Sequence, residues 1–375
     1  MNLTSRERLL RIFRNKEVDR PALKLWGAEL HTTNFLHPMY QPVAKLAAET
    51  SDLFGGASFD FNFHAGKHID RYREVYRTDT KNPDWKDQHT IFHTPKGDLH
   101  SIDRISVKNE PHYIVEHMVK EPEDIDKLLS MEYEPFTLSS DAYDTAVSQM
   151  GERGVVMIGV HHAPYAVQTL MGSETLAYFS IDEREKLQHL IQVYADRALA
   201  HAKAILALGI QEPIFSTVGP ELFLPPLMSA NDFEEFVHDI DKPIWDEVHN
   251  AGGHVWVHSH GKVANFIDSF IDMGVDVLNP LEPPKNGDID MNAIVARYGN
   301  RIGWEGNIEI QEILRSSKER LAALIDECVA AGSKSGRFIL CPSSGYMEYP
   351  FPTEQYMDNL IFYLKHGLEA VERCR

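Results

Sequence analysis

Eight short apolar runs recur along the 375-residue chain, and the later ones alternate with segments that carry a helical repeat of apolar residues. Strands and helices that alternate at this length are typical of βα units, whose strands form a parallel sheet. Eight such units favour an α/β fold of the (β/α)8, or TIM, barrel type, with a doubly wound sheet as the alternative. The expected strands are 21–27, 57–63, 154–160, 211–217, 254–258, 275–281, 301–305 and 337–341.

The helical segments between the later runs end at glycine, which commonly follows the last helical residue. These helices are expected at 230–250, 263–273, 291–298 and 310–331. Segment 66–121 breaks the alternation, because Thr94-Pro95-Lys96-Gly97-Asp98 is a turn signal between short β-like runs. We therefore expect one domain over residues 1–375, with an inserted β-hairpin subdomain at about 66–121.

The composition disfavours several classes of protein. The 37 Lys and Arg against 56 Asp and Glu give a net charge of −19, which suits neither nucleic acid nor an anionic membrane as partner. The three cysteines are too few for a disulfide framework, and the charged N-terminus does not resemble a signal peptide. No apolar stretch is long enough to span a bilayer. We expect a cytoplasmic protein, and its oligomeric state is left open.

Active sites of barrels lie at the carboxyl ends of the strands, so polar residues that follow the apolar runs are the candidates. This set is rich in histidine and carboxylate, which suits a metal ion or acid–base chemistry. Its members are Trp26, Glu29, His31, Asp60, Asn62, His64, His161, His162, Tyr165, Ser216, Thr217, Glu221, His258, His260, Asn279, Glu282, Glu305, Asn307, Ser343, Ser344 and Tyr346.

The most distinctive local feature is the run Val255-Trp256-Val257-His258-Ser259-His260-Gly261. Residues two apart in an extended segment point to one side, so His258 and His260 can converge on one ion. Glu221 follows the preceding strand, and two imidazoles with one carboxylate and an open position form a known catalytic zinc set. The simpler interpretation is that the histidines hydrogen-bond loops or bind an anionic substrate, and the short pattern alone favours it.

Three further residues have alternative roles. Glu282 is a fourth metal ligand, a hydrogen-bond partner of a histidine, or a helix-capping acid. Asn307 holds a substrate carbonyl or caps the helix that begins near Ile310, and capping is the more frequent use. Cys341 is a buried thiol near a strand end, which is the common situation for cysteine, or a thiolate ligand.

These motifs, in this order and spacing, resemble the superfamily of uroporphyrinogen decarboxylases and cobalamin-dependent methyltransferases over nearly the whole chain. The resemblance implies a barrel fold. It rests on Thr4-Ser5-Arg6-Glu7-Arg8 with Asp19-Arg20-Pro21, His258-Ser259-His260-Gly261, Gly274-Val275-Asp276, Asn279-Pro280-Leu281-Glu282, Gly287-Asp288, Gly306-Asn307-Ile308 and Pro352-Thr353-Glu354.

Two departures from the superfamily's patterns distinguish among its activities. True uroporphyrinogen decarboxylases carry an Arg-Gln-Ala-Gly-Arg run after the first strand, and its arginines hold the porphyrinogen carboxylates. The corresponding residues 24–31 of this chain contain no arginine. The methyltransferases bind zinc through His-x-Cys and a later Cys. His258 matches the histidine, whereas His260 and Ser344 stand at the two cysteine positions. Ligation by histidine and glutamate suits an oxygen-containing substrate rather than a thiol.

The resemblance therefore implies a zinc-dependent methyltransferase of the O-demethylase type, which moves a methyl group from a small methoxylated or N-methyl compound to a corrinoid. The Asp-x-His-x-x-Gly run of the family's corrinoid carriers is absent, so the corrinoid is expected on a partner protein. A metal-independent decarboxylase of a substrate smaller than a porphyrin is the alternative, and a non-catalytic binding protein is the third hypothesis. The expected roles are catalysis for His258 and Glu221, zinc binding for Glu221, His258 and His260, and substrate binding for Trp26, His64, Tyr165, Asn279, Asn307 and Tyr346.

Overall fold

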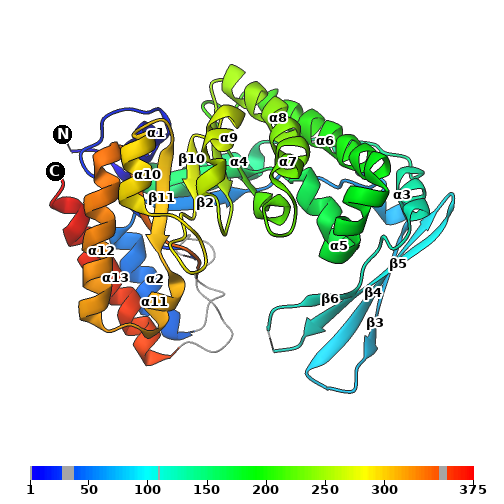
Figure 1. Cartoon of the computed structure of the whole chain (residues 1–375), viewed down its shortest axis with the longest axis horizontal. Helices are drawn as coiled ribbons and strands as arrows, with labels where there is room; N and C mark the ends of the chain where they lie inside the picture. The colour runs from blue at the N-terminus through cyan, green and yellow to red at the C-terminus, as the bar shows by residue number, and fades with distance from the viewer. Residues whose placement is uncertain (1, 28–37, 109, 346–352) are drawn as a thin grey trace.

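Eight parallel strands form a curled sheet in the computed structural model, which describes residues 2–27, 38–108, 110–345 and 353–375 (Figure 1). The two edge strands meet at Asp52: its backbone N–H donates to the Leu23 carbonyl at 2.7 Å, and its carboxylate accepts from the Leu23 N–H at 2.9 Å. The (β/α)8 barrel predicted from the sequence is thereby confirmed. The strands lie in the order β1 (Ala22–Leu23), β12 (Phe338–Pro342), β11 (Gly303–Ile308), β10 (Val277–Asn279), β9 (His254–His258), β8 (Ile214–Val218), β7 (Gly154–Gly159) and β2 (Leu53–Ala57).

Seven of the expected apolar runs cover half or more of a barrel strand, whereas the run 57–63 shares only Ala57 with a strand and was placed too late in the chain. The second strand is Leu53–Ala57, so it ends at the residue where that run begins. Gly55 and Gly56 occupy its centre, and glycine weakens the sequence signal of a strand. At Gly55 a side chain would meet the methyl group of Met150 at 2.8 Å, so the helix behind this strand packs directly on its backbone.

The helices cover the outside of the sheet, as βα units require. Two expected helices are interrupted: 230–250 contains a π-helical turn at Glu234–His238, and 310–331 breaks where the Ser317 side chain accepts from the Arg320 N–H. The helices are α1 (Ser5–Phe13), α2 (Gln41–Thr50), α3 (Pro122–Leu129), α4 (Asp141–Met150), α5 (Ala163–Asp182), α6 (Arg184–Leu206), α7 (Ala230–Phe233), α8 (Asp239–Asn250), α9 (Ile267–Met273), α10 (Met291–Tyr298), α11 (Ile310–Arg315), α12 (Lys318–Gly332) and α13 (Glu354–Glu372).

An antiparallel sheet, here named the arm sheet, lies within the segment expected to be an insertion. Figure 1 shows it at the end of the molecule opposite the two termini, near α3 and α5. Thr94 and Gly97 pair across the tight turn that the sequence indicated. That residues 1–375 form a single domain stays a prediction. The strands of the arm sheet are β3 (Arg73–Asp79), β4 (Trp85–Thr94), β5 (Gly97–Ser106) and β6 (Tyr113–Glu116).

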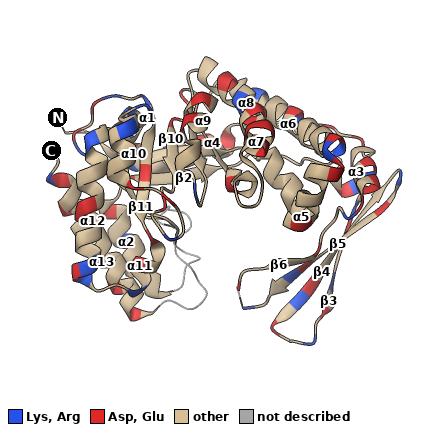
Figure 2. Ribbon diagram, viewed as in Figure 1, with Lys and Arg blue, Asp and Glu red and all other residues tan. Residues whose placement is uncertain are grey.

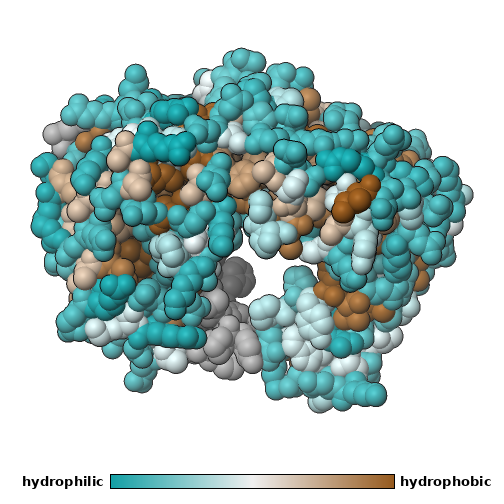
Figure 3. All heavy atoms as spheres, in the orientation of Figure 1, coloured by the Kyte–Doolittle hydropathy of each residue, from teal (hydrophilic) through white to brown (hydrophobic). Residues whose placement is uncertain are grey.

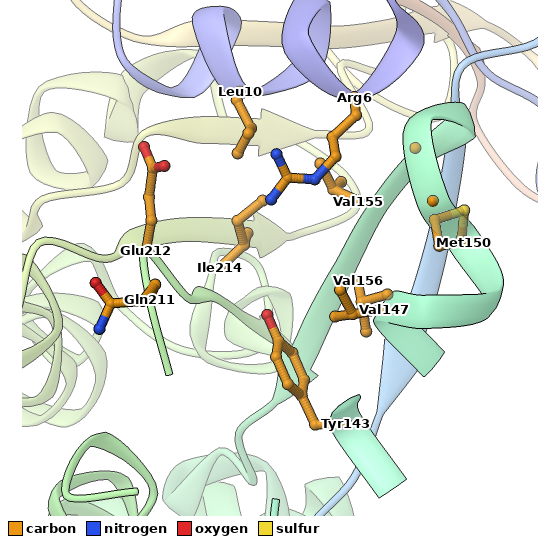
Figure 4. Close-up of a pocket in the computed structure, with 12 residues that line it drawn as sticks. Arg6, Leu10, Tyr143, Val147, Met150, Val155, Val156, Gln211, Glu212 and Ile214 are labelled. Atoms are coloured by element: carbon orange, nitrogen blue, oxygen red, sulfur yellow. The ribbon is translucent and has the colours of Figure 1, made fainter. Parts of the chain in front are cut away.

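The amino ends of the barrel strands are closed by a buried ion-pair network. Arg8 contacts Asp19 at 2.8 Å, and both Arg8 and Arg20 pair with Asp52. The N-terminal motif that the sequence singled out therefore stabilises the base of the barrel. A cavity of only about 30 Å³, lined by residues such as Tyr143, lies at the same end (Figure 4). Across the described ranges, no helix is long and apolar enough to cross a membrane.

Candidate functional site

The carboxyl ends of β8, β9 and β10 carry the three predicted metal ligands and Asn279. His258 ends β9 and lies between Val218 of β8 and Asn279 of β10 in the strand register. Glu221 lies in the short turn Pro220–Phe223 that follows β8. Because parallel strands end at one edge of the sheet, three segments far apart in sequence converge on this mouth.

His258 and His260 face each other in this mouth. Their ring centroids lie 4.5 Å apart with the planes at 89°. His258 Nδ1 lies 2.7 Å from Asn279 Oδ1, and His260 Nδ1 lies 3.0 Å from Glu282 Oε1. Glu282 also accepts from the Gly261 N–H at 2.7 Å. Of the three roles considered for Glu282, the structure shows the hydrogen-bond partner of a histidine.

A buried chain of polar contacts fixes the orientation of His258. Glu305 Oε1 accepts from the Asn279 amide at 2.9 Å and from Lys24 Nζ at 2.6 Å. A carboxylate only accepts, so the Asn279 NH₂ group must face Glu305 and its oxygen must face His258. Nδ1 of His258 therefore carries the proton, and the lone pair of Nε2 is left for a ligand.

The two histidines have opposite electrostatic surroundings. Burial lowers the pKa of His258 to about 4, with the positive charges of His260 and Lys24 acting in the same direction. The hydrogen bond to Glu282 raises the pKa of His260 above 6.5, and the charges of Glu221 and Glu309 add to this effect. His258 is therefore a neutral ligand or base across the physiological range.

Glu221 is a half-buried carboxylate beside the histidine pair. Burial raises its pKa above the usual value, while the charge of His260 acts in the opposite direction. One of its oxygens, Oε2, is buried without a hydrogen-bond partner. A buried acceptor without a partner is costly, so this oxygen is suited to receive a proton or a cation.

The chemistry of these residues fits a zinc ion, although the three proposed ligands are not preassembled. Two imidazole nitrogens and one carboxylate oxygen are a catalytic zinc donor set, and each histidine already has its Nδ1 hydrogen-bonded, as metal-bound histidines do. Within the described residues, however, no three His, Cys, Asp or Glu side chains form a group placed to hold a metal. Zinc binding by His258, His260 and Glu221 therefore stays a prediction.

The predicted substrate residues divide between two cavities at the mouth. Trp26 lines a cavity of about 300 Å³ beside Lys24, and its ring lies 5.5 Å from that of His258. His64 and Tyr165 line a second cavity of about 380 Å³ between α5 and the segment after β2. Tyr346 lies outside the described residues, as do Glu29 and His31.

The two predicted asparagines both have contacts within the protein, although Asn307 is half-buried and also lines a third cavity of about 350 Å³. Asn279 is fully buried and bonded at both polar ends, so the structure makes it a support for His258 rather than a substrate contact. Asn307 donates to the Leu281 carbonyl at 2.7 Å and does not cap the helix that follows. The Ser343 hydroxyl accepts from the Ile310 N–H instead, at 3.1 Å.

Other roles emerge only from the folded chain. Cys341 is fully buried within β12, which agrees with the buried-thiol interpretation. Lys24 is a buried cation that contacts the ring faces of Trp26 at 4.1 Å and Trp256 at 4.8 Å. The sequence signal for it is a lysine inside an apolar strand run. Glu309 is also buried, with Oε1 lacking a partner, and it lies near His260.

The fold and the site together define an α/β-barrel protein with a histidine–carboxylate cluster at the carboxyl ends of its strands. A model of the uroporphyrinogen decarboxylase (URO-D) family matches residues 105–354, more than half of the chain. The chain belongs to the uroporphyrinogen decarboxylase family. No curated protein matches it.

Solved structures support the fold. A methyltransferase from Methanosarcina mazei has a TM-score of 0.58 and 14% sequence identity, and the match covers 97% of this chain and 99% of that one. At this identity the likeness shows a shared fold alone. A broad-specificity GH5-4 endoglucanase from Clostridium acetobutylicum matches with a TM-score of 0.36 and 10% identity, over 68% of this chain and 79% of that chain, and carries no argument.

Proposed function

We propose that this chain is a zinc-dependent methyltransferase that moves a methyl group from a small methoxylated or N-methyl compound to a corrinoid, as O-demethylases do. The observation that carries the proposal is the pair of facing imidazoles, each held through Nδ1 so that Nε2 is left for a ligand. The family membership and the fold shared with the Methanosarcina mazei methyltransferase support it.

In this proposal His258, His260 and Glu221 hold the metal. Zinc bound by them would supply a Lewis acid that polarises the oxygen of a methyl ether. Asn279 and Glu305 keep His258 in the tautomer that can ligate, and Glu282 does the same for His260. Trp26 limits the access of water on one side of His258, since its indole packs edge-on against that imidazole.

We propose a separate corrinoid protein as the methyl acceptor. The chain lacks the Asp-x-His-x-x-Gly run of the family's corrinoid carriers. The acceptor must approach over the barrel mouth, in line with the methyl group, because group transfer depends strongly on orientation. Acidic residues are spread over the helices and the arm sheet (Figure 2), and their charge would steer a basic surface on the partner. A cytoplasmic location stays a prediction.

The direct test combines the purified chain with zinc, reduced corrinoid and a panel of methoxylated aromatics and methylamines. Methylcobalamin formation, followed by absorbance, is the expected result, and metal analysis should find up to one zinc per chain. A metal-independent decarboxylase is the second candidate, favoured by the family to which the chain belongs. Release of CO₂ from a small carboxylic acid by metal-free protein, with no methyl transfer from any donor, would establish the decarboxylase instead.

A further inference from the structure

The cavity of about 380 Å³ at the mouth adjoins His258 through the strand register. Val218 lines this cavity and is the register partner of His258 in the neighbouring strand. Figure 3 shows hydrophobic side chains gathered near α5. Four residues of this helix, Tyr165, Ala166, Thr169 and Leu170, line the cavity. The volume is within the range of small-molecule sites.

Aromatic rings form much of the cavity wall. Phe61 stacks on His161 with centroids 5.1 Å apart and planes at 22°. Phe63 meets Phe61 nearly at a right angle, with centroids 4.7 Å apart. Offset stacking and edge-to-face contacts are the arrangements that aromatic rings prefer, so a flat ring entering this cavity finds both kinds of surface.

The side chains that line the cavity are apolar, aromatic or neutral polar groups, apart from His162, whose Nε2 lies 3.0 Å from Asp241 Oδ2. Among the described residues that line it, none is Lys, Arg, Asp or Glu. Burial lowers the pKa of His64 to about 4, and burial also lowers the pKa of His161, so both rings are neutral at pH 7. An ion that entered would lose water without gaining a partner of opposite charge, which is strongly unfavourable.

Arg197 makes the cavity especially unfavourable for cations. Its guanidinium donates to the carbonyls of Phe63 and His64, and it lies 4.2 Å from the ring centroid of Tyr133. Within the described ranges, the groups that act on its charge are the phenols of Tyr194 and Tyr133, and no carboxylate is among them. Its positive charge therefore acts on the cavity, and it contributes to the low pKa of His64. The same field opposes a methylammonium group. Arg197 is not among the residues that line the cavity, so an anion bound there would gain no direct ion pair from it.

We propose that this cavity binds the uncharged aromatic ring of an aryl methyl ether, so that the chain selects neutral O-methyl donors over methylammonium and carboxylate-bearing ones. This inference rests on the proposed methyltransferase function and names its substrate class. His64 Nδ1 bonds the Tyr194 hydroxyl at 2.7 Å, which leaves Nε2 to contact a polar substituent on the ring.

Calorimetric binding to the full chain, without corrinoid, tests the proposal. The probes are 2-methoxyphenol as the neutral ether, 4-methoxybenzoate as the anion and tetramethylammonium as the cation. We expect 2-methoxyphenol to bind at least about tenfold more tightly than either ion. Equal or tighter binding of either ion would overturn the proposal.

Two substitutions test whether the ligand binds in this cavity. Val218→Asp introduces a charge into the cavity and should weaken binding of 2-methoxyphenol about tenfold. Val75→Asp on the arm sheet is the matched control, since the two valines are 44% and 48% exposed, and it should leave binding unchanged. Ala166→Phe fills the cavity and should abolish binding. Unaltered affinity in Val218→Asp and Ala166→Phe, with normal thermal melts, would contradict the assignment.

The outcomes separate this inference from the proposed function. If 2-methoxyphenol binds with the expected selectivity but no methyl group reaches a corrinoid, the methyltransferase proposal fails and the cavity assignment stands. If methylcobalamin forms from tetramethylammonium in preference to methoxyphenols, the methyltransferase proposal stands and the cavity assignment is overturned.

Discussion

Asn279 holds the imidazole of His258 in one tautomer, with its side-chain oxygen 2.7 Å from Nδ1 and its NH₂ group 2.9 Å from Glu305. Both atoms of the amide are committed, so the ring cannot exchange its donor and acceptor without breaking a buried contact. His258 thus presents Nε2 as an acceptor before any ligand arrives.

Removing the Asn279 side chain should weaken metal binding although Asn279 is not itself a proposed metal ligand. Asn279→Ala is expected to reduce zinc affinity by about 10- to 100-fold, the usual effect of losing a partner of a ligating histidine. Asn359→Ala is the matched control, because Asn359 is also buried but donates to the Ile313 carbonyl in a different part of the fold. Zinc titration with a competing chelator gives the comparison. Equal affinities in the two variants would show that Asn279 does not support a metal ligand.

The buried pair of Lys24 and Glu305 should contribute strongly to folding stability. Their side chains are 2% and 0% exposed, and removing one partner of such a pair leaves an uncompensated charge. Lys24→Met is expected to cost about 3–5 kcal/mol of unfolding free energy. Lys203→Met breaks a surface pair with Glu247 and should cost less than about 1 kcal/mol. Denaturant unfolding measures both, and comparable losses would contradict the burial argument.

The base of the barrel should lose stability in acid. The hydrogen bond from Arg14 lowers the pKa of Glu212 to about 2, and His254 contributes a second hydrogen bond. A carboxyl group with a lowered folded pKa stabilises the fold above its unfolded pKa, near 4.3, and this contribution is lost as pH falls from about 5 toward 2. Glu212→Gln should reduce the change in unfolding free energy between pH 5 and pH 2. Glu174→Gln, at an exposed position, is the control and should leave this change as it is in the wild type. A wild-type curve that matches the Glu212→Gln curve between pH 5 and pH 2 would refute the assignment.

Uroporphyrinogen should not be a substrate despite the family to which the chain belongs. Residues 24–31 lack the arginines of true decarboxylases, and the one lysine there is committed to Glu305. A substrate with eight carboxylates would meet a chain of net charge −19 and a cavity without cations. Incubation with uroporphyrinogen should yield no decarboxylated porphyrinogen, with a true decarboxylase as the positive control. Turnover at a comparable rate would invalidate this expectation.

The barrel was predictable because its strands and helices alternate with a regular pattern, and the period-two spacing of His258 and His260 correctly placed both at one mouth. The second strand was missed because Gly55 and Gly56 weaken its apolar pattern. The contact between Lys24 and Glu305 joins residues 281 positions apart. No local pattern encodes such a pair, because it depends on β1 and β11 both packing against β12 in the closed barrel.

The roles of Asn279 and Asn307 illustrate a further limit. Each follows or ends an apolar strand as a substrate-binding residue would, and their sequence context does not distinguish a side chain that faces the mouth from one that faces a neighbouring strand. In the folded chain both amides are used within the protein. Tyr165 is exposed and Asn279 is fully buried. This difference in exposure arises only when the barrel assembles.

Methyl transfer by a His258→Ala variant tests the central claim most directly. The assay follows methylcobalamin absorbance with zinc, reduced corrinoid and 2-methoxyphenol, and it uses His189→Ala on the exposed face of α6 as the matched control. The account predicts that the wild type and His189→Ala form methylcobalamin, whereas the folded His258→Ala variant forms none. Methylcobalamin formation by His258→Ala at the wild-type rate would contradict it.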